Sequence, residues 1–169
     1  MADAPDRYLS PNHGPRRNGL RPSLIVLHYT AMDSAEAACA RLCDPAAEVS
    51  AHYLITGKGE TVPLVPEDQR AWHAGRSCWW DPALGVWRSR LNDFSVGIEL
   101  EGDDCTPFTQ AQYTSLVDAV GWLMARYPAL TPQRITSHAK VAPLRKTDPG
   151  PAFDWAYFRQ RLSQAAFKR

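Results

Sequence analysis

Two histidines at the ends of apolar, β-branched runs are the first candidates for chemistry. His28 follows the run Leu24 to Leu27 and shares an alternating face with Leu24 and Val26, and His138 follows a second short run in the same way. Each histidine taken alone fits a structural role better than a ligand role. Together they place two imidazoles at two strand ends, where a sheet opens toward a cleft, and they therefore form a candidate ligand pair.

The segment 145–151 (RKTDPGP) adds a carboxylate and an ammonium group. Pro149 restricts Asp148 to extended backbone, so the side chains of Lys146 and Asp148, two residues apart, are expected to point the same way. Two neutral imidazoles and one carboxylate form a three-ligand zinc set that leaves the fourth position for water, as catalytic zinc sites do, whereas structural zinc sites are closed. Lys146 beside such a site could stabilise an oxyanion.

Hydrolysis at a zinc site also needs a base that takes a proton from water. Glu99 and Glu101 share one face of the expected strand 95–101, and Val96, Ile98 and Leu100 form its other face. Carboxylates in such a position are more commonly solvated, so both interpretations stay open on spacing alone. The residues indicate a mononuclear zinc hydrolase as a hypothesis.

The rest of the sequence predicts the elements that must position these groups. Alternating and β-branched runs predict strands, and apolar residues at helical spacing predict helices, the clearest of which starts with a capping box formed by Thr109 and Gln112. The expected fold class is α/β, a single domain with a central mixed β-sheet flanked by helices. In chain order we expect strand 23–29, helix 34–43, a hairpin of 51–56 and 60–65, strand 95–101, helix 109–127, strand 134–138 and helix 154–166.

Three segments show neither helical nor strand period. Residues 1–22, rich in proline and arginine, are expected to form an extended N-terminal arm, which leaves 23–169 as the catalytic domain. Residues 72–93 hold four of the six tryptophans and are expected to be a functional loop, whose indoles either contact a ligand or pack the loop onto the domain. Residues 139–151 are expected to form a rigid loop.

Composition and charge exclude several classes of protein. The chain has 169 residues, 44% of them hydrophobic and 22% charged, and a net charge of +1, so no global charge attracts nucleic acid. No run has the length of a membrane-spanning helix, and residues 1–22 hold neither a signal-peptide core nor a lipobox cysteine. We therefore expect a cytoplasmic monomer without a membrane anchor. Four cysteines are too few for a disulfide framework and are expected to be reduced.

Six motifs follow one another along nearly the whole chain, from about Ser10 to the last helix: LHYT (27–30), SAHYLI (50–55), AWHAG (71–75), NDFSVGIELEG (92–102), SHAKVAP (137–143) and RKTDPGPAFDW (145–155). In this order they resemble the zinc-dependent N-acetylmuramoyl-L-alanine amidases (type 2 amidases). That family includes the cytosolic anhydromuropeptide amidase of cell-wall recycling and its periplasmic lipoprotein relative. The resemblance implies a mixed sheet with helices on both faces, a fold shared with peptidoglycan-recognition proteins.

The resemblance implies a role for each residue that matches a family motif. His28, His138 and Asp148 would bind one Zn²⁺ per chain. Glu99 would be the general acid/base, and Lys146 would polarise the scissile carbonyl or hold its oxyanion. His52 would be structural. Substrate-binding positions would be Tyr29, Trp72, His73 and Arg90.

The implied activity is hydrolysis of the amide between (1,6-anhydro-)N-acetylmuramic acid and L-alanine of the stem peptide, in peptidoglycan turnover or recycling. Ala51 stands where other amidases of this kind carry a tyrosine, which assigns the base role to Glu99. The segment between His28 and Ser50 is shorter than in the recycling enzyme and favours the lipoprotein branch, whereas the missing anchor favours recycling. The substrate form stays open between soluble anhydro-muropeptides and intact peptidoglycan.

Two alternatives to a recycling enzyme remain. The first is a non-catalytic module that binds muropeptides, although such modules typically lose a metal ligand and this chain has all three. The second is a phage or competition-type endolysin that acts on intact cell wall. Activity on sacculi compared with soluble muropeptides would separate these possibilities.

Overall fold

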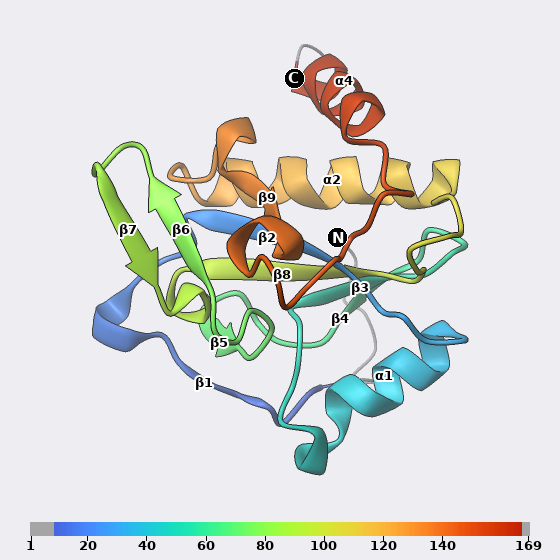
Figure 1. The fold of residues 1–169 in the computed structure, drawn as a ribbon, viewed down its shortest axis with the longest axis horizontal. Coiled ribbons are helices and arrows are strands. Elements are labelled where there is room, and N and C mark those ends of the chain that lie inside the picture. Colours follow the sequence, from blue (N-terminus) through green and yellow to red (C-terminus); the bar gives the residue numbers. More distant parts are fainter. Residues whose placement is uncertain (1–8, 167–169) are drawn as a thin grey trace.

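The computed structural model describes residues 9–166 and has a five-stranded mixed sheet at its centre (Figure 1). The strand order is β4-β3-β8-β2-β9, in which β4 alone runs antiparallel to its neighbour. The sheet and its helices confirm the fold class predicted from the sequence. Its strands are β2 (Leu24–Tyr29), β3 (Tyr53–Ile55), β4 (Thr61–Pro63), β8 (Ser95–Leu100) and β9 (Ile135–Ser137).

Helices cover both faces of this sheet (Figure 1). α2 and α4 lie on one face, and α1 lies on the other, where it packs against Leu54 of β3. The α-helices are α1 (Ala35–Cys43), α2 (Gln110–Arg126), α3 (His138–Val141) and α4 (Trp155–Ala166). Four short 3-10 helices are η1 (Arg17–Gly19), η2 (Pro45–Ala47), η3 (Leu91–Asp93) and η4 (Pro132–Arg134).

Side-chain alternation along β2 decides which residues reach the functional face. Ile25 and Leu27 belong to the main core with α2, and Leu24 and Val26 belong to a second apolar cluster on the opposite face. All four side chains are fully buried, and each stabilises the fold by about 1.5–3 kcal/mol. The same alternation turns His28 toward the face of Leu24 and Val26, away from α2.

The predicted helix starts are confirmed by their caps. The Ser34 hydroxyl accepts a hydrogen bond from the backbone N–H of Ala37 at the start of α1. Thr109 and Gln112 form the expected capping box of α2. Asp154 accepts from the N–H three residues on, in the first turn of α4. These local signals locate helix ends because each side chain satisfies a backbone donor that the helix itself leaves free.

The expectation of an irregular loop over 72–93 is wrong. This segment contains a β-hairpin of β6 (Cys78–Asp81) and β7 (Val86–Ser89), whose register pairs Trp80 with Trp87. The two strands are short, and the inward-facing position of Asp81 is charged. Their sequence therefore lacks the apolar alternation that predicts a strand. A preceding strand, β5 (Gln69–Ala71), pairs with β1 (His13–Pro15).

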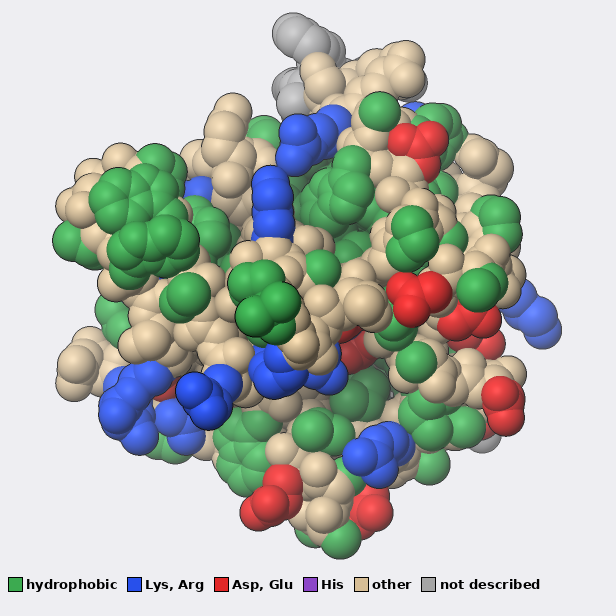
Figure 2. All heavy atoms as spheres, in the orientation of Figure 1, with side chains coloured by type: hydrophobic (Ala, Val, Ile, Leu, Met, Phe, Trp, Pro, Cys, Tyr) green, Lys and Arg blue, Asp and Glu red, His purple; other side chains and the backbone are tan. Residues whose placement is uncertain are grey.

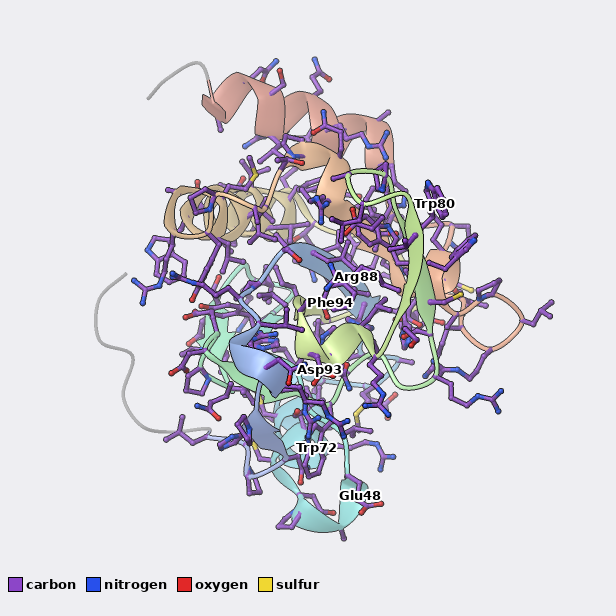
Figure 3. The ribbon with its side chains drawn as sticks, turned by 90° about the vertical axis from the view of Figure 1, so that its left-hand side faces the viewer. Glu48, Trp72, Trp80, Arg88, Asp93 and Phe94 are labelled. Atoms are coloured by element: carbon purple, nitrogen blue, oxygen red, sulfur yellow. The ribbon has the colours of Figure 1, made fainter. Side chains whose placement is uncertain are left out.

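The tryptophans of this hairpin divide between packing and exposure. Trp79 packs against the cluster of Leu24 and Val26, and the Arg134 guanidinium lies 5.0 Å from its ring. Trp80 and Trp87 are 45% and 68% exposed. With Leu84 and Val86 they form the apolar patch on the hairpin in Figure 2, and Trp80 lies at the outer edge of the side view in Figure 3.

The expectation of a loop from 139 to 151 is also wrong in its first residues. β9 ends at Ser137, and His138 opens the short helix α3 instead of ending the strand. The Ser137 hydroxyl accepts from the N–H of Lys140 at 3.0 Å, which caps that helix. A serine that suits a strand end therefore serves here as an N-cap.

The described part of the N-terminal arm lies against the domain. Ser10, Asn12 and Arg16 are buried, and the Asn12 amide donates to the carbonyls of Asp44 and Val49. Residues 1–8 of the predicted arm lie outside the described residues, and its boundary at 22 stays a prediction.

The described residues also bear on the expectations for membrane and cysteines. Within 9–166, none of the helices combines the length and apolarity that a membrane span requires. All four cysteines are free thiols. That these thiols are reduced in the cell stays a prediction.

Candidate active site

The topology brings His28, His138 and Asp148 together. β2 and β9 are parallel neighbours with Leu27 opposite Ser137, so the residues that follow, the two histidines, lie side by side. The backbone N–H of the residue after His138 donates to the Asp148 carbonyl at 2.9 Å and holds the 145–151 loop against α3. This cluster is the potential metal site found among the described residues.

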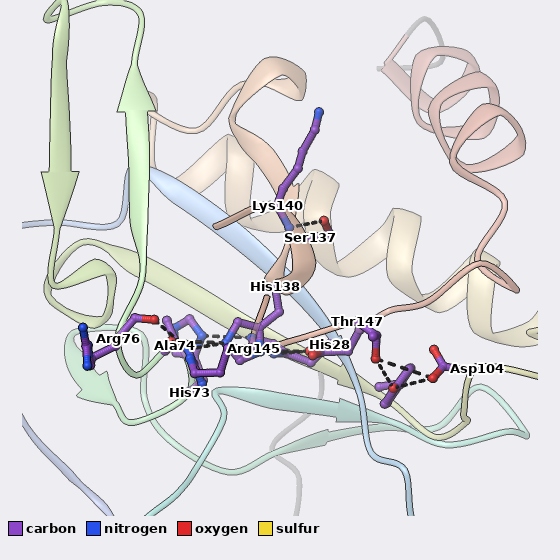
Figure 4. Close-up of polar contacts among 12 residues, drawn as sticks. His28, His73, Ala74, Arg76, Asp104, Ser137, His138, Lys140, Arg145 and Thr147 are labelled. Carbon is purple, nitrogen blue, oxygen red and sulfur yellow. Dashed lines mark hydrogen bonds and ion pairs between the residues drawn. The ribbon is translucent and has the colours of Figure 1, made fainter. Parts of the chain in front are cut away.

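The three side chains offer one ligand atom each, and these atoms all lie within 4.8 Å of one another. Figure 4 shows the two histidines of this cluster. Asp148 Oδ2 lies 2.8 Å from His28 Nδ1 and 3.0 Å from His138 Nδ1, and the two nitrogens are 3.0 Å apart. All three residues are buried. Burial lowers the pKa of His28 to about 4, so its imidazole is neutral near pH 7. Burial also opposes ionisation of Asp148, but the two imidazoles next to the carboxylate hold its pKa below the usual value.

The carbonyl of Ala74 fixes the tautomer of His138. His138 Nε2 lies 3.1 Å from this oxygen, which can only accept, so Nε2 carries the proton and donates. In the neutral ring, Nδ1 then keeps its lone pair for the cluster. Arg145 Nη2 donates to the same carbonyl at 2.8 Å and to the carbonyl of Arg76 at 2.8 Å, which clamps this segment to the ligand loop (Figure 4).

A cavity of about 440 Å³ opens onto the cluster. Its walls come from the ends of β2 and β8, from α1, from the 72–73 segment and from the 145–148 loop. Lys146 and Asp148 both line it, as the extended-loop argument predicted. Six further residues proposed from the sequence also line the cavity, namely His28, Tyr29, Trp72, His73, Glu99 and His138.

Glu99 lies opposite His28 in the parallel pairing of β8 with β2 and therefore faces the same cavity. Its Oε2 atom is buried and has no hydrogen-bond partner among the described residues. Burial, reinforced by the charge of Asp148, raises the pKa of Glu99 well above its usual value, and the Lys146 ammonium opposes the shift. The solvated interpretation of this carboxylate is therefore wrong, and Glu99 has a free oxygen for a proton in the cavity.

The proposed substrate-binding residues do not all come together. Trp72 and Tyr29 lie at the cavity, and the Tyr29 hydroxyl contacts Thr147 at 2.6 Å. His73 lines the cavity, yet it is buried and both of its ring nitrogens have partners within the protein. Arg90 does not line this cavity but a separate depression near η1.

His52 takes the structural place expected for it. It is fully buried, its Nδ1 accepts from the N–H of Gly97 at 3.0 Å, and its Nε2 lies 3.2 Å from the carbonyl of Gln69. The guanidinium of Arg16 lies 3.1 Å from the same Nε2. Burial lowers the pKa of His52 to about 3, so the ring stays neutral.

Sequence reasoning missed the groups that orient the cluster. The carbonyl of Ala74 accepts from His138, and the guanidinium of Arg145 donates to that same carbonyl. The hydroxyl of Ser95 contacts His73. A backbone carbonyl leaves no signature in a sequence, and Arg145 was visible as part of the RKTDPGP segment. Ser95 carried no signal, because a serine that opens a strand is common.

Comparison with known proteins gives the family. The family model described as N-acetylmuramoyl-L-alanine amidase matches residues 18–151. The chain is 43% identical over 176 residues to the 1,6-anhydro-N-acetylmuramyl-L-alanine amidase AmpD of Enterobacter cloacae, which covers 94% of this chain and 90% of that protein.

Solved structures agree with this match. A selenomethionine derivative of AmpD superposes with a TM-score of 0.81 at 42% identity, covering 91% of this chain and 92% of that one. The E. coli amidase AmiD, in complex with anhydro-N-acetylmuramic acid-L-Ala-D-gamma-Glu-L-Lys, gives 0.72 at 36% identity, covering 92% of this chain and 61% of that one. By sequence AmiD is 39% identical over 83% of this chain, so AmpD of Enterobacter cloacae matches with higher identity and coverage despite the short segment after His28. The chain belongs to the N-acetylmuramoyl-L-alanine amidase family.

Proposed function

We propose that this amidase uses one zinc ion, held by His28, His138 and Asp148, and that its substrates are soluble 1,6-anhydro-muropeptides of peptidoglycan recycling. One observation carries the proposal. Three side chains able to ligate a metal converge on a single cavity with the Glu99 carboxylate, whose buried Oε2 has no hydrogen-bond partner within residues 9–166. The bond cleaved is the amide between N-acetylmuramic acid and L-alanine.

The chemistry of the donor set fits zinc. The cluster offers two imidazole nitrogens and one carboxylate oxygen, which is the ligand type and number of catalytic zinc sites. His138 keeps its Nδ1 lone pair because its Nε2 proton is used by a carbonyl, and the low pKa of Asp148 keeps the carboxylate ionised. When bound, zinc acts as a Lewis acid and lowers the pKa of water.

Glu99 supplies the proton transfers. Its free Oε2 takes a proton from the attacking water as the bond to the carbonyl carbon forms, and the same oxygen then gives that proton to the nitrogen of L-alanine as the C–N bond breaks. The products are a lactyl carboxylate and a free peptide amine. The raised pKa of Glu99 suits the second step, because the carboxyl must hold the proton until the amine leaves.

Lys146 supports the charge that develops on the carbonyl oxygen. Its side chain lines the cavity together with Asp148, and it has no ion pair among the described residues. An ammonium group placed at a developing oxyanion stabilises the transition state more than the ground state. Tyr29 and Trp72 form walls of the same cavity and would contact the substrate.

The comparisons favour the soluble substrate. The names of the AmpD proteins state the 1,6-anhydro sugar, and solved complexes of AmiD and of a Pseudomonas aeruginosa relative hold anhydromuramic peptides. A non-catalytic binding module is the weaker candidate, because all three ligand positions and Glu99 are present here. Similar endolysin structures have at most 23% identity and support the fold alone.

Mass spectrometry of the reaction products tests this proposal. The zinc-loaded protein is incubated in parallel with anhydro-muropeptides and with intact sacculi, and an EDTA-treated sample is the control. Peptide released from the soluble substrate only supports recycling and, with it, the predicted cytoplasmic location. Release from sacculi indicates wall remodelling or lysis instead, and the absence of metal-dependent release from either substrate would refute the zinc amidase.

A further inference from the structure

A chain of buried hydrogen bonds runs from His28 away from the cavity. His28 Nε2 lies 3.0 Å from His73 Nδ1, and His73 Nε2 lies 3.0 Å from the hydroxyl of Ser95 (Figure 4 shows His28 and His73). The Ser95 hydroxyl in turn donates to the carbonyl of Leu91 at 2.7 Å. The three side chains and Leu91 are all buried, so water does not compete for these bonds.

The direction of every proton in this chain follows from its last acceptor. The carbonyl of Leu91 can only accept, so the single hydroxyl proton of Ser95 goes to it. Ser95 Oγ can then only accept from His73, which places the proton of His73 on Nε2. The ring of His73 is buried, and among the described residues its two nitrogens contact His28 and Ser95 and no carboxylate that would compensate a positive charge. In the neutral ring its Nδ1 therefore accepts from Nε2–H of His28.

Packing leaves the ring of His73 a single orientation. A Cβ atom at Gly97 would stand 2.4 Å from Cγ of His73, so the ring fills the space that a larger residue at position 97 would take. The ring of His52 flanks it at 5.7 Å between centroids. Hydrogen bonds and packing contacts therefore both hold His73 in place. A side chain that swings out to bind substrate would not be held in this way.

We propose that His73 and Ser95 are positioning residues that hold His28 in the tautomer with Nε2 protonated and its Nδ1 lone pair directed at the metal. This inference rests on the proposed zinc site. His138 reaches the same tautomer through the backbone carbonyl of Ala74, which no substitution removes. The His28 branch is built from side chains and can be tested by mutation. Partners of ligating histidines of this kind typically change metal affinity about 10- to 100-fold when removed.

Zinc affinity, measured by competition with a chromogenic chelator, is the principal readout. We expect Ser95→Ala and His73→Leu to raise the zinc dissociation constant about 10- to 100-fold. His73→Asn, which keeps an acceptor near the position of Nδ1, is expected to recover part of the loss. His13→Asn is the control: it alters an exposed histidine of β1 that lies outside this chain of hydrogen bonds, and zinc affinity should stay unchanged.

A second measurement does not depend on the variants folding. The ¹⁵N chemical shifts of His28 in the zinc-free wild type report its tautomer, and we expect a protonated Nε2. A protonated Nδ1 in the neutral ring would overturn the proposal, as would folded Ser95→Ala and His73→Leu proteins that bind zinc as tightly as the wild type. Failure of the wild type itself to bind zinc would instead refute the proposed function, so the two failures are distinguishable.

Discussion

Glu99 and Glu101 are the same residue type on the same face of one extended segment, yet their surroundings give them different chemistry. The Glu101 carboxylate accepts from the backbone N–H groups of Ala35 and Gly57, so both of its oxygens hold structure together. The Oε2 of Glu99 has no such partner among residues 9–166 and faces the cavity. A carboxylate can carry protons in a reaction only if its oxygens are not already committed to the fold.

Replacing Glu99 by glutamine should separate catalysis from metal binding. We expect Glu99→Gln to lower kcat by about 10²- to 10⁴-fold, because the amide cannot take the proton from water, while zinc content stays at the wild-type level. Turnover is measured as peptide release by mass spectrometry. Zinc content per chain is measured by elemental mass spectrometry. Glu101→Gln is the matched control and should keep its turnover. Near-normal turnover of Glu99→Gln would show that another group is the base.

Replacing His28 should remove the metal together with the activity. His28→Ala leaves one imidazole and one carboxylate, which is one donor fewer than catalytic zinc sites use. After dialysis against metal-free buffer, we expect less zinc per chain than in the wild type and loss of peptide release. His13→Ala, which changes an exposed histidine of β1, should retain its zinc. An equal zinc content in both variants would contradict the ligand assignment.

At the scale of elements, the hairpin β6–β7 depends on one buried carboxylate. Asp81 is fully buried and forms ion pairs with Arg88 at 3.1 Å and Arg134 at 2.6 Å. Arg88 also lies over the ring of Phe94, 3.4 Å from its centroid (Figure 3). Asp81 thus joins both strands of the hairpin to the segment that leads into β9. Ion pairs of Asp81 therefore hold the inner face of the hairpin to the domain, while its outer face is apolar and exposed.

Removing this carboxylate should destabilise the protein. Asp81→Ala leaves two partly buried guanidinium groups without their acceptor, and breaking a buried ion pair in this way costs about 3–5 kcal/mol of unfolding free energy. Urea denaturation followed by circular dichroism measures the loss. Asp118→Ala, at an exposed position of α2, should change stability by no more than about 0.5 kcal/mol. Equal stability of the two variants would mean that Asp81 does not anchor the hairpin.

At the scale of the whole molecule, buried neutral histidines make stability depend on pH. The pKa of His52 is lowered to about 3 by burial and by the Arg16 guanidinium next to it, whereas in the unfolded chain it is near 6.5. Between these values the unfolded state binds a proton that the folded state does not. Stability from this group is therefore complete above pH 6.5 and decreases as the pH falls toward 3.

The His52 contribution can be isolated by comparing variants. At pH 5 the protonation of the unfolded chain should reduce the wild-type unfolding free energy by about 2 kcal/mol relative to pH 7.5 through His52 alone. In His52→Asn this contribution is absent, so its stability should fall less steeply over the same range. His13→Gln, at an exposed position, should keep the wild-type slope. Parallel curves for wild type and His52→Asn would refute this origin of the pH dependence.

Much of the site was predictable because its signals are local. The caps of α1, α2 and α4, the apolar run of β2 and the RKTDPGP segment that carries Asp148 are each signals that span only a few residues. The motifs, in their order, also indicated the family. Backbone geometry at this range follows from residue type, since a cap or an alternating strand is decided by its immediate neighbours.

The tertiary structure decided the environment of these residues. Only the parallel pairing of β8 with β2 puts Glu99 opposite His28, where its Oε2 has no partner among the described residues, and only the fold makes the cavity-lining His73 a partner of His28. Arg90, matched by its motif, lies outside the cavity for the same reason. Burial, hydrogen-bond partners and proton positions depend on contacts between distant segments. The sequence by itself therefore determined which groups are present, and the packing of those segments determined what each group can do.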